Sequence, residues 1–247
     1  MKAFPFFRTF PVRRIFMRPW RRKLGPPLLV GGSIGALLIT FFGSRLLVRP
    51  LGLLGSMTAA TFLAAALLLG AIFLLPPPGN ADRRICWHLP GPRELLLVLA
   101  GWLAVLTGSA FLTQLWRLLL ESCRIPFETE QTLVQMARSA ELPVFFQILL
   151  LTAVAVPLTE ELIFRRCLPE LLAPLGPRSA LLLGAFIVAA AHGFLLGLPG
   201  LFFIGLIFQI LCNVTRNLWC SILCHALLNG SVLILNRAAE LFSETCP

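Results

Sequence analysis

Long apolar segments recur along this chain and constrain its fold more than any other feature. Seven such runs are separated by short polar or charged stretches: 27–48, 51–75, 95–120, 144–164, 181–198, 201–214 and 218–235. A hydrocarbon core about 30 Å thick is crossed by about 20 helical residues, so four or five of these runs are long enough to span it. The run 201–214 is short, and we expect it to be tilted, broken or partly buried. The sequence predicts an all-α polytopic transmembrane bundle of about seven spans (range about six to eight).

Composition excludes the other classes. Apolar residues make up 57 % of the chain and charged residues 13 %, about half the charged share of a soluble domain. A soluble domain this apolar would have too little polar surface to stay dispersed, and a disordered chain needs the opposite balance. Transmembrane β-strands would read as short alternating segments, and these runs do not alternate.

Basic residues predict the orientation. Residues 1–23 carry eight Lys or Arg side chains and no acidic one, so we expect a cytoplasmic N-terminus that contacts anionic lipid and binds no nucleic acid. The segment from Glu121 to Glu141 has four Glu and is expected outside. Later arginines fall on the cytoplasmic side: Arg83, Arg84, Arg93, Arg165, Arg166, Arg178 and Arg216. The predicted location is the plasma or inner cell membrane.

Ionisable residues within the spans concentrate in the C-terminal half. This asymmetry divides the chain into four parts: a basic segment 1–26, an accessory membrane region 27–142, a functional core of about four helices at 143–236, and a tail 237–247. Intramembrane ionisable residues are costly to bury and usually functional.

The first candidate motif is "PLTEELIFRRCL". Glu161 and Arg165 are four residues apart, the favourable order for a helical ion pair. Glu160 is rotated by about 100° from Glu161 and needs another partner. An ordinary charged helix end at the membrane surface is the alternative interpretation.

Two further motifs lie in the following apolar runs. His192 is expected deep within an alanine-rich helix, where a lone His is more often a satisfied core residue than a ligand. His225 and Asn229 share one face of the last helix and can both hydrogen-bond inward. Together the motifs supply two carboxylates, two imidazoles and an amide, which is what a site that activates water requires. We expect this site to line a water-filled cavity open to the cytoplasm.

These motifs resemble those of the CAAX protease and bacteriocin-processing (CPBP) family of intramembrane proteases, which includes type II CAAX prenyl endopeptidases. The resemblance rests on "EELIFRR", "VAAAH" and "HALLN", and it covers about residues 144–236. The chain departs from the family pattern at Val188, where the second motif usually has Phe. We expect this difference to alter packing or substrate fit.

The resemblance implies the role of each residue. Glu160 would be the general base that activates water for attack on a peptide carbonyl. His192 and His225 would orient the water and stabilise the intermediate, and Asn229 would donate to the oxyanion. Glu161 and Arg165 would hold the site in place. The substrate would be a membrane-associated protein or peptide.

Two mechanisms are open for such a site, one with a metal ion and one without. Family members have been described both as glutamate-dependent enzymes and as metalloproteases. We favour the mechanism without a metal, because "HExxH" is missing and the ligands would come from three helices. The alternative is a zinc ion held by Glu160, His192 and His225, a donor set that zinc accepts.

Two other functions stay open: a non-catalytic relative, such as a bacteriocin-immunity or scaffold protein, and a proton-coupled transporter. A rhomboid-type Ser protease is disfavoured because "GxSG" is missing, and an aspartyl dyad is impossible because Asp82 is the chain's one Asp. Cys220 and Cys224 predict small-residue packing on one helix face. Cys123 and Cys246 would both lie outside, and their pairing is a further hypothesis.

Overall fold

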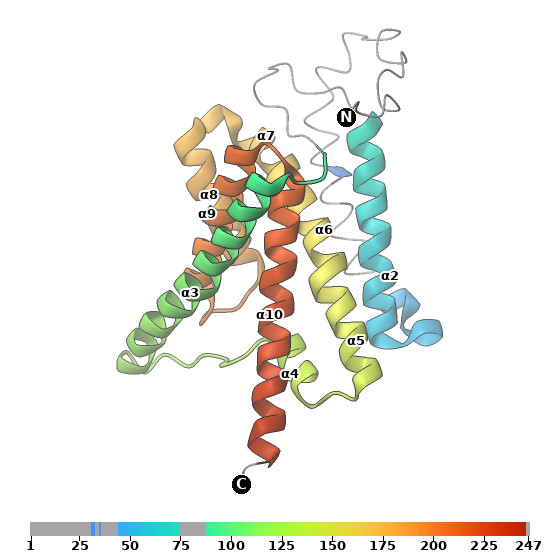
Figure 1. Ribbon diagram of the computed structural model, residues 1–247, viewed down its shortest axis with the longest axis vertical. Helices are drawn as coiled ribbons and strands as arrows, with labels where there is room; N and C mark the ends of the chain where they lie inside the picture. Colours follow the sequence, from blue (N-terminus) through green and yellow to red (C-terminus); the bar gives the residue numbers. More distant parts are fainter. Residues whose placement is uncertain (1–30, 33–34, 36–43, 75–86, 246–247) are drawn as a thin grey trace.

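The computed structural model describes residues 31–32, 35, 44–74 and 87–245, and all regular elements in this part of the chain are helical (Figure 1). The predicted all-α class is therefore confirmed. The elements run in the order α2 (Ser44–Leu74), α3 (Pro92–Ser122), α4 (Thr132–Ser139), α5 (Leu142–Leu150), η4 (Leu151–Ala155), α6 (Val156–Glu161), η5 (Leu162–Cys167), α7 (Leu168–Leu172), η6 (Ala173–Leu175), α8 (Pro177–Ala191), α9 (Leu198–Thr215) and α10 (Leu218–Thr245).

Four helical segments among the described residues are long and apolar enough to cross a membrane. They are Pro92–Ser122, Leu142–Leu175, Leu198–Thr215 and Leu218–Ser243. The count of about seven spans is thus not confirmed, and most of the run 27–48 lies outside the described residues. The short run at 201–214 belongs to α9, which with 18 residues is one of the four.

Two predicted segment limits are wrong. The helical segment Leu142–Leu175, called the rod below, continues past residue 164. The charged residues among 160–166 lie within this segment and do not end it. Conversely, α8 ends at Ala191, so the run 181–198 holds the last part of this 15-residue helix and the loop that follows it. Gly193, with φ of 60°, adopts the left-handed conformation that commonly ends helices.

Prolines explain why the rod 142–175 changes helix type twice. Pro157 and Pro169 lack the N–H that an α-helix would donate to the carbonyl four residues earlier. Each follows a π-helical stretch, η4 or η5, whose wider turn accommodates the missing hydrogen bond. Single π turns occur often at functional sites, and here they flank Glu160 and Glu161.

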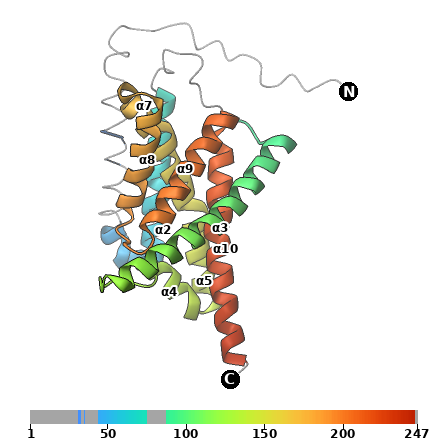
Figure 2. The same cartoon turned by 90° about the vertical axis from the view of Figure 1, so that its left-hand side faces the viewer.

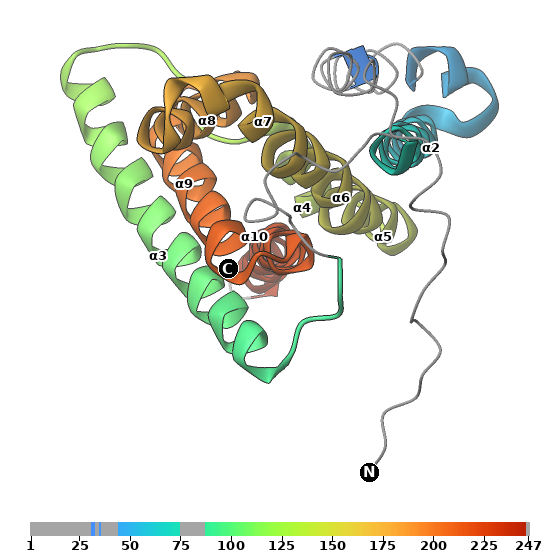
Figure 3. The ribbon, with the colours of Figure 1, turned by 90° about the horizontal axis from the view of Figure 1, so that it is seen from above.

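The helices form two connected layers around α10 (Figures 2 and 3). On one side α3 packs on α9 and α10, and on the other the rod 142–175 packs on α10 and α2. The proposed accessory region is therefore in direct contact with the core, and the Thr159 hydroxyl donates to the Thr61 carbonyl of α2 at 3.2 Å.

Small residues bring α3 close to its partners. A Cβ on Gly101 would lie 3.4 Å from the Cys224 sulfur, and one on Gly200 would lie 2.6 Å from the Thr113 hydroxyl oxygen. Cys220 and Cys224 are both fully buried, which confirms their predicted packing role. Cys123 is free and exposed, and its hypothetical partner Cys246 lies outside the described residues.

The last helix is longer than expected. The segment 237–247 was predicted as a tail, but α10 continues through residue 245. Arg237 lies in this extension, where its guanidinium contacts the Ala137 and Ala140 carbonyls at the end of α4 and covers the ring of Phe145 at 4.8 Å. The extension therefore binds α10 to the start of the predicted functional core.

Candidate active site

Glu161 is the centre of a buried polar cluster between the rod 142–175 and α10. Its side chain is 1 % exposed. One oxygen, Oε1, accepts from His225 Nδ1 at 3.0 Å, and the other accepts from the Ser221 hydroxyl. Arg165 Nε lies 3.0 Å from Oε2, and Arg165 is 2 % exposed. A buried carboxylate with three polar partners is anchored in one orientation.

Phe208 of α9 closes this cluster on one side. Its ring centroid lies 5.1 Å from the His225 ring and 5.7 Å from the Arg165 guanidinium carbon. Arg165, predicted to lie on the cytoplasmic side, is buried within the helical rod. The Phe208 ring therefore covers one side of the Glu161 cluster.

Glu160 lies in a different environment, although it precedes Glu161 directly. Its side chain is half-buried, and no hydrogen bond or ion pair involves it among the residues that the structure describes. Rotation by about 100° along the helix moves it off the face that α10 covers. Of the two carboxylates, Glu160 is thus the more accessible one, whereas Glu161 is buried.

His192 lies at the C-terminal end of α8 and not deep within a helix, contrary to the sequence expectation. The residue is exposed, and its Nδ1 lies 2.8 Å from the Val188 carbonyl oxygen. A carbonyl can only accept, so Nδ1 carries the hydrogen and Nε2 of the neutral ring holds a lone pair. The Val188 contact thus leaves Nε2 as the ring nitrogen without a described partner.

The turn at Gly176 relates His192 to Glu160. Each lies sixteen residues from Gly176 along the chain, one on the rod and one at the end of α8. The rod and α8 extend from this turn toward the same end of the bundle with opposite chain directions (Figure 1), and sixteen α-helical residues rise about 24 Å. His192 has no described contact with Glu160 or His225, so the described structure does not join these candidate residues.

Asn229 lies one helical turn beyond His225 on α10. Its Nδ2 donates to the Thr152 carbonyl in η4 at 2.8 Å. The π-helical turn makes this carbonyl available, because its regular α-helical hydrogen bond is displaced. The amide keeps a second N–H and an acceptor oxygen for further partners.

A metal site is not assembled by the candidate residues. In the described ranges, no three His, Cys, Asp or Glu side chains are grouped so that they could hold a metal ion. His225 directs Nδ1 to Glu161, and His192 lies apart at the end of α8. The zinc set Glu160, His192 and His225 therefore does not fit this arrangement, and no step below involves a metal.

Sequence reasoning missed three contributors to the site. Ser221 lies four residues before His225 on the same face of α10, a spacing that could have indicated it. Phe208 and the Thr152 carbonyl come from other helices, and nothing local in the sequence marks them.

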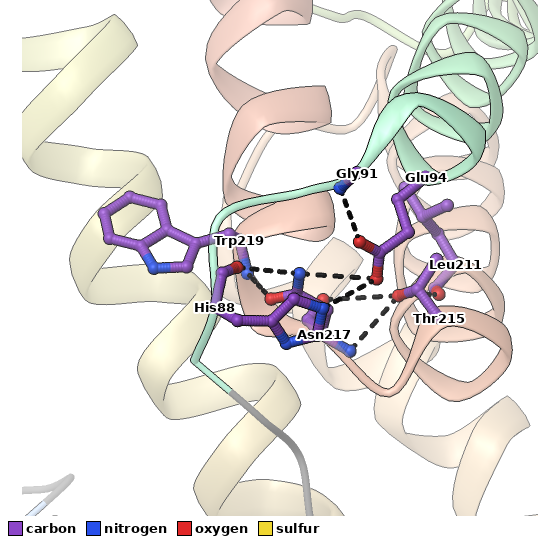
Figure 4. A network of polar contacts seen from close by, with 7 residues as sticks. All are labelled: His88, Gly91, Glu94, Leu211, Thr215, Asn217 and Trp219. Atoms are coloured by element: carbon purple, nitrogen blue, oxygen red, sulfur yellow. Dashed lines mark hydrogen bonds and ion pairs between the residues drawn. The ribbon is translucent and has the colours of Figure 1, made fainter. Parts of the chain in front are cut away.

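A second polar network, also missed, lies at the turn between α9 and α10 (Figure 4). Asn217 is fully buried there. Its amide donates to the His88 carbonyl at 2.9 Å and to Glu94 Oε1 at 3.4 Å, and it accepts from the Trp219 N–H at 3.1 Å. Glu94 also accepts from the Gly91 N–H at 2.8 Å, which caps α3. This network anchors the start of α3 to the α9–α10 turn.

Comparison with known proteins identifies one segment of the chain, and this segment contains the candidate site. Residues 142–231 match the family model described as type II CAAX prenyl endopeptidase Rce1-like. No curated protein and no solved structure gives a significant match to the chain. The matched segment contains all three motifs, from Glu160 to Asn229, so the resemblance inferred from them is confirmed.

Proposed function

From the type II CAAX prenyl endopeptidase Rce1-like domain at residues 142–231, we propose that this chain is an intramembrane endopeptidase. It hydrolyses a peptide bond of a membrane-associated protein or peptide. The observation that carries the proposal is the family match over the segment that holds every candidate residue. The free Glu160 carboxylate beside the anchored Glu161 cluster supports the same reaction.

In the proposed mechanism Glu160 takes a proton from water, and the water oxygen forms a bond to the substrate carbonyl carbon. Glu160 then returns the proton to the amine as the carbon–nitrogen bond breaks. Glu160 has no described partner and is suited to binding this water, and the family resemblance assigns His192 to orienting it. No metal or other cofactor takes part in the proposed steps.

Oxyanion stabilisation is assigned to His225 and Asn229. Glu161 accepts from His225 Nδ1, which sets the ring orientation and stabilises an imidazolium whose Nε2–H is a donor. The second N–H of Asn229 lies one turn further along the same helix. Arg165 and Ser221 are positioning residues, because they act through Glu161.

The proposed orientation places the basic ends of the helices in the cytoplasm. The starts of α3 and α8 and the end of α9 share one end of the bundle (Figure 1), and these ends carry Arg93, Arg178 and Arg216. The opposite end carries Glu121 and Glu141. This distribution follows the positive-inside rule for a chain in the cell or plasma membrane. The proposed contact of the N-terminus with anionic lipid falls on residues outside the described part.

The test compares protein termini in cells that express the wild type, Glu160→Gln or Glu141→Gln at matched levels. Mass spectrometry of new N- and C-termini needs no prior choice of substrate. Glu141 is an exposed carboxylate without a described partner and serves as the matched control. We expect a set of termini that is lost with Glu160→Gln and kept with Glu141→Gln.

Equal termini in all three, with folded protein in each, would contradict the protease and favour a non-catalytic scaffold or immunity function. Loss of pH-dependent solute flux in Glu160→Gln would instead indicate a proton-coupled transporter.

A further inference from the structure

We propose that a cleft beside His192 is a substrate subsite that selects a Lys or Arg side chain. The cleft lies between the segment that follows α3 and the loop that joins α8 to α9. This inference rests on the proposed protease function and adds the substrate class to it.

The cleft has a volume of about 380 Å³ and is lined by Pro126, Phe127, Glu128, Gly193 and Leu195. Gly193 follows His192 directly, so a side chain held in this cleft would lie next to the imidazole that the proposed mechanism assigns to the water. One wall belongs to residues outside the Rce1-like match, which begins at residue 142.

The wall formed by the α8–α9 loop is fixed in place. Trp116 of α3 donates its indole N–H to the Leu195 carbonyl at 3.0 Å. The Leu198 N–H reaches the same carbonyl at 3.2 Å, and the Gly193 N–H donates to the Ala190 carbonyl at 3.1 Å. A loop held at both ends and at its centre gives the cleft a preformed shape, which reduces the entropy lost on binding.

Charge and shape select a basic side chain. Glu128 is exposed and has no described ion-pair partner, whereas its neighbours are paired: Glu121 with Arg117 at 3.0 Å and Glu130 with Arg138 at 2.6 Å. The apolar surfaces of Phe127 and Leu195 suit the aliphatic part of Lys or Arg, while the charged end reaches the Glu128 carboxylate. The Phe127 ring can add a cation–π contact.

The experiment extends the comparison of termini to Glu128→Gln and Glu128→Lys, with Glu141→Lys as the control for charge reversal elsewhere. Among the Glu160-dependent termini, we expect Lys or Arg to be enriched at one position near the cleavage site. This preference should fall about fivefold in Glu128→Gln, the size expected for a partly exposed ion pair. It should change to Glu or Asp in Glu128→Lys and persist in Glu141→Lys.

The preference is then measured with purified enzyme and two peptides that differ only by Lys or Gln at that position. The readout is the ratio of kcat/KM for the Lys peptide to kcat/KM for the Gln peptide. Thermal unfolding in detergent checks that each variant is folded. Glu160-dependent termini without a basic preference, or with one that Glu128→Lys leaves unchanged, would overturn the subsite and leave the protease standing. An absence of Glu160-dependent termini would overturn both.

Discussion

Glu160 and Glu161 are neighbours in the sequence but lie in two different regions of the molecule. Glu161 is buried between the rod 142–175 and α10, with Ser221, His225 and Arg165 around it. Glu160 lies off that face with no described partner. Under the proposed function this difference suits the two carboxylates to separate tasks: the buried, paired one would fix the geometry, and the other would exchange a proton with water.

Glu160→Gln gives the largest expected effect on catalysis. Loss of a general base should lower kcat by about 10²- to 10⁴-fold. Thermal unfolding should change little, because no described interaction is lost. The measurement is turnover of a substrate found by the terminus comparison, together with a melting curve in detergent. A variant that keeps wild-type turnover would remove the proposed difference between the two carboxylates.

Glu161→Gln should act mainly on stability. It leaves the buried Arg165 without a charge partner, which costs about 3–5 kcal/mol. Glu170→Gln is a matched control, since Glu170 pairs with Arg166 at the same helical spacing but in a more exposed position. Its loss should cost about 1 kcal/mol or less. Unfolding free energies from denaturant titration in detergent provide the comparison, and equal losses would show that burial does not distinguish the pairs.

Asn217→Ala tests whether a buried polar cluster away from the candidate site affects stability alone. It removes two donors and an acceptor from the network at the α9–α10 turn, and we expect a loss of about 1–3 kcal/mol. Activity per folded molecule should stay constant, because this network does not contact the candidate catalytic residues. A fall in kcat at full folding would show that the two clusters are coupled.

Trp116→Phe should give the smallest effect and acts on the exposed side of the site. It keeps an aromatic ring but removes the hydrogen bond to Leu195 near His192. We expect a two- to tenfold fall in kcat, from a hydrogen bond of about 0.5–1.5 kcal/mol. Trp102→Phe breaks a comparable bond to Ser231, at 3.1 Å and away from the loop, and should leave kcat unchanged. Equal kcat values for both variants would contradict the positioning role of Trp116.

The membrane class, the helical fold and the three motifs could be predicted from the amino-acid sequence alone. Apolar run length and composition are local properties, and they carry over directly into helices in lipid. The spacing of Glu161 and Arg165 also predicted their ion pair, because four residues make one turn of a helix.

Which of the two glutamates is buried depends on how the helices pack. Both positions are equally available on an isolated helix, and the packing of α10 on one face buries Glu161 and leaves Glu160 without a partner among the described residues. The end of α8 at His192 depends on the backbone conformation of Gly193, which an apolar run does not reveal. Likewise, Trp116 reaches Leu195 across 79 residues of sequence, since contacts of this kind arise only when separate helices pack together.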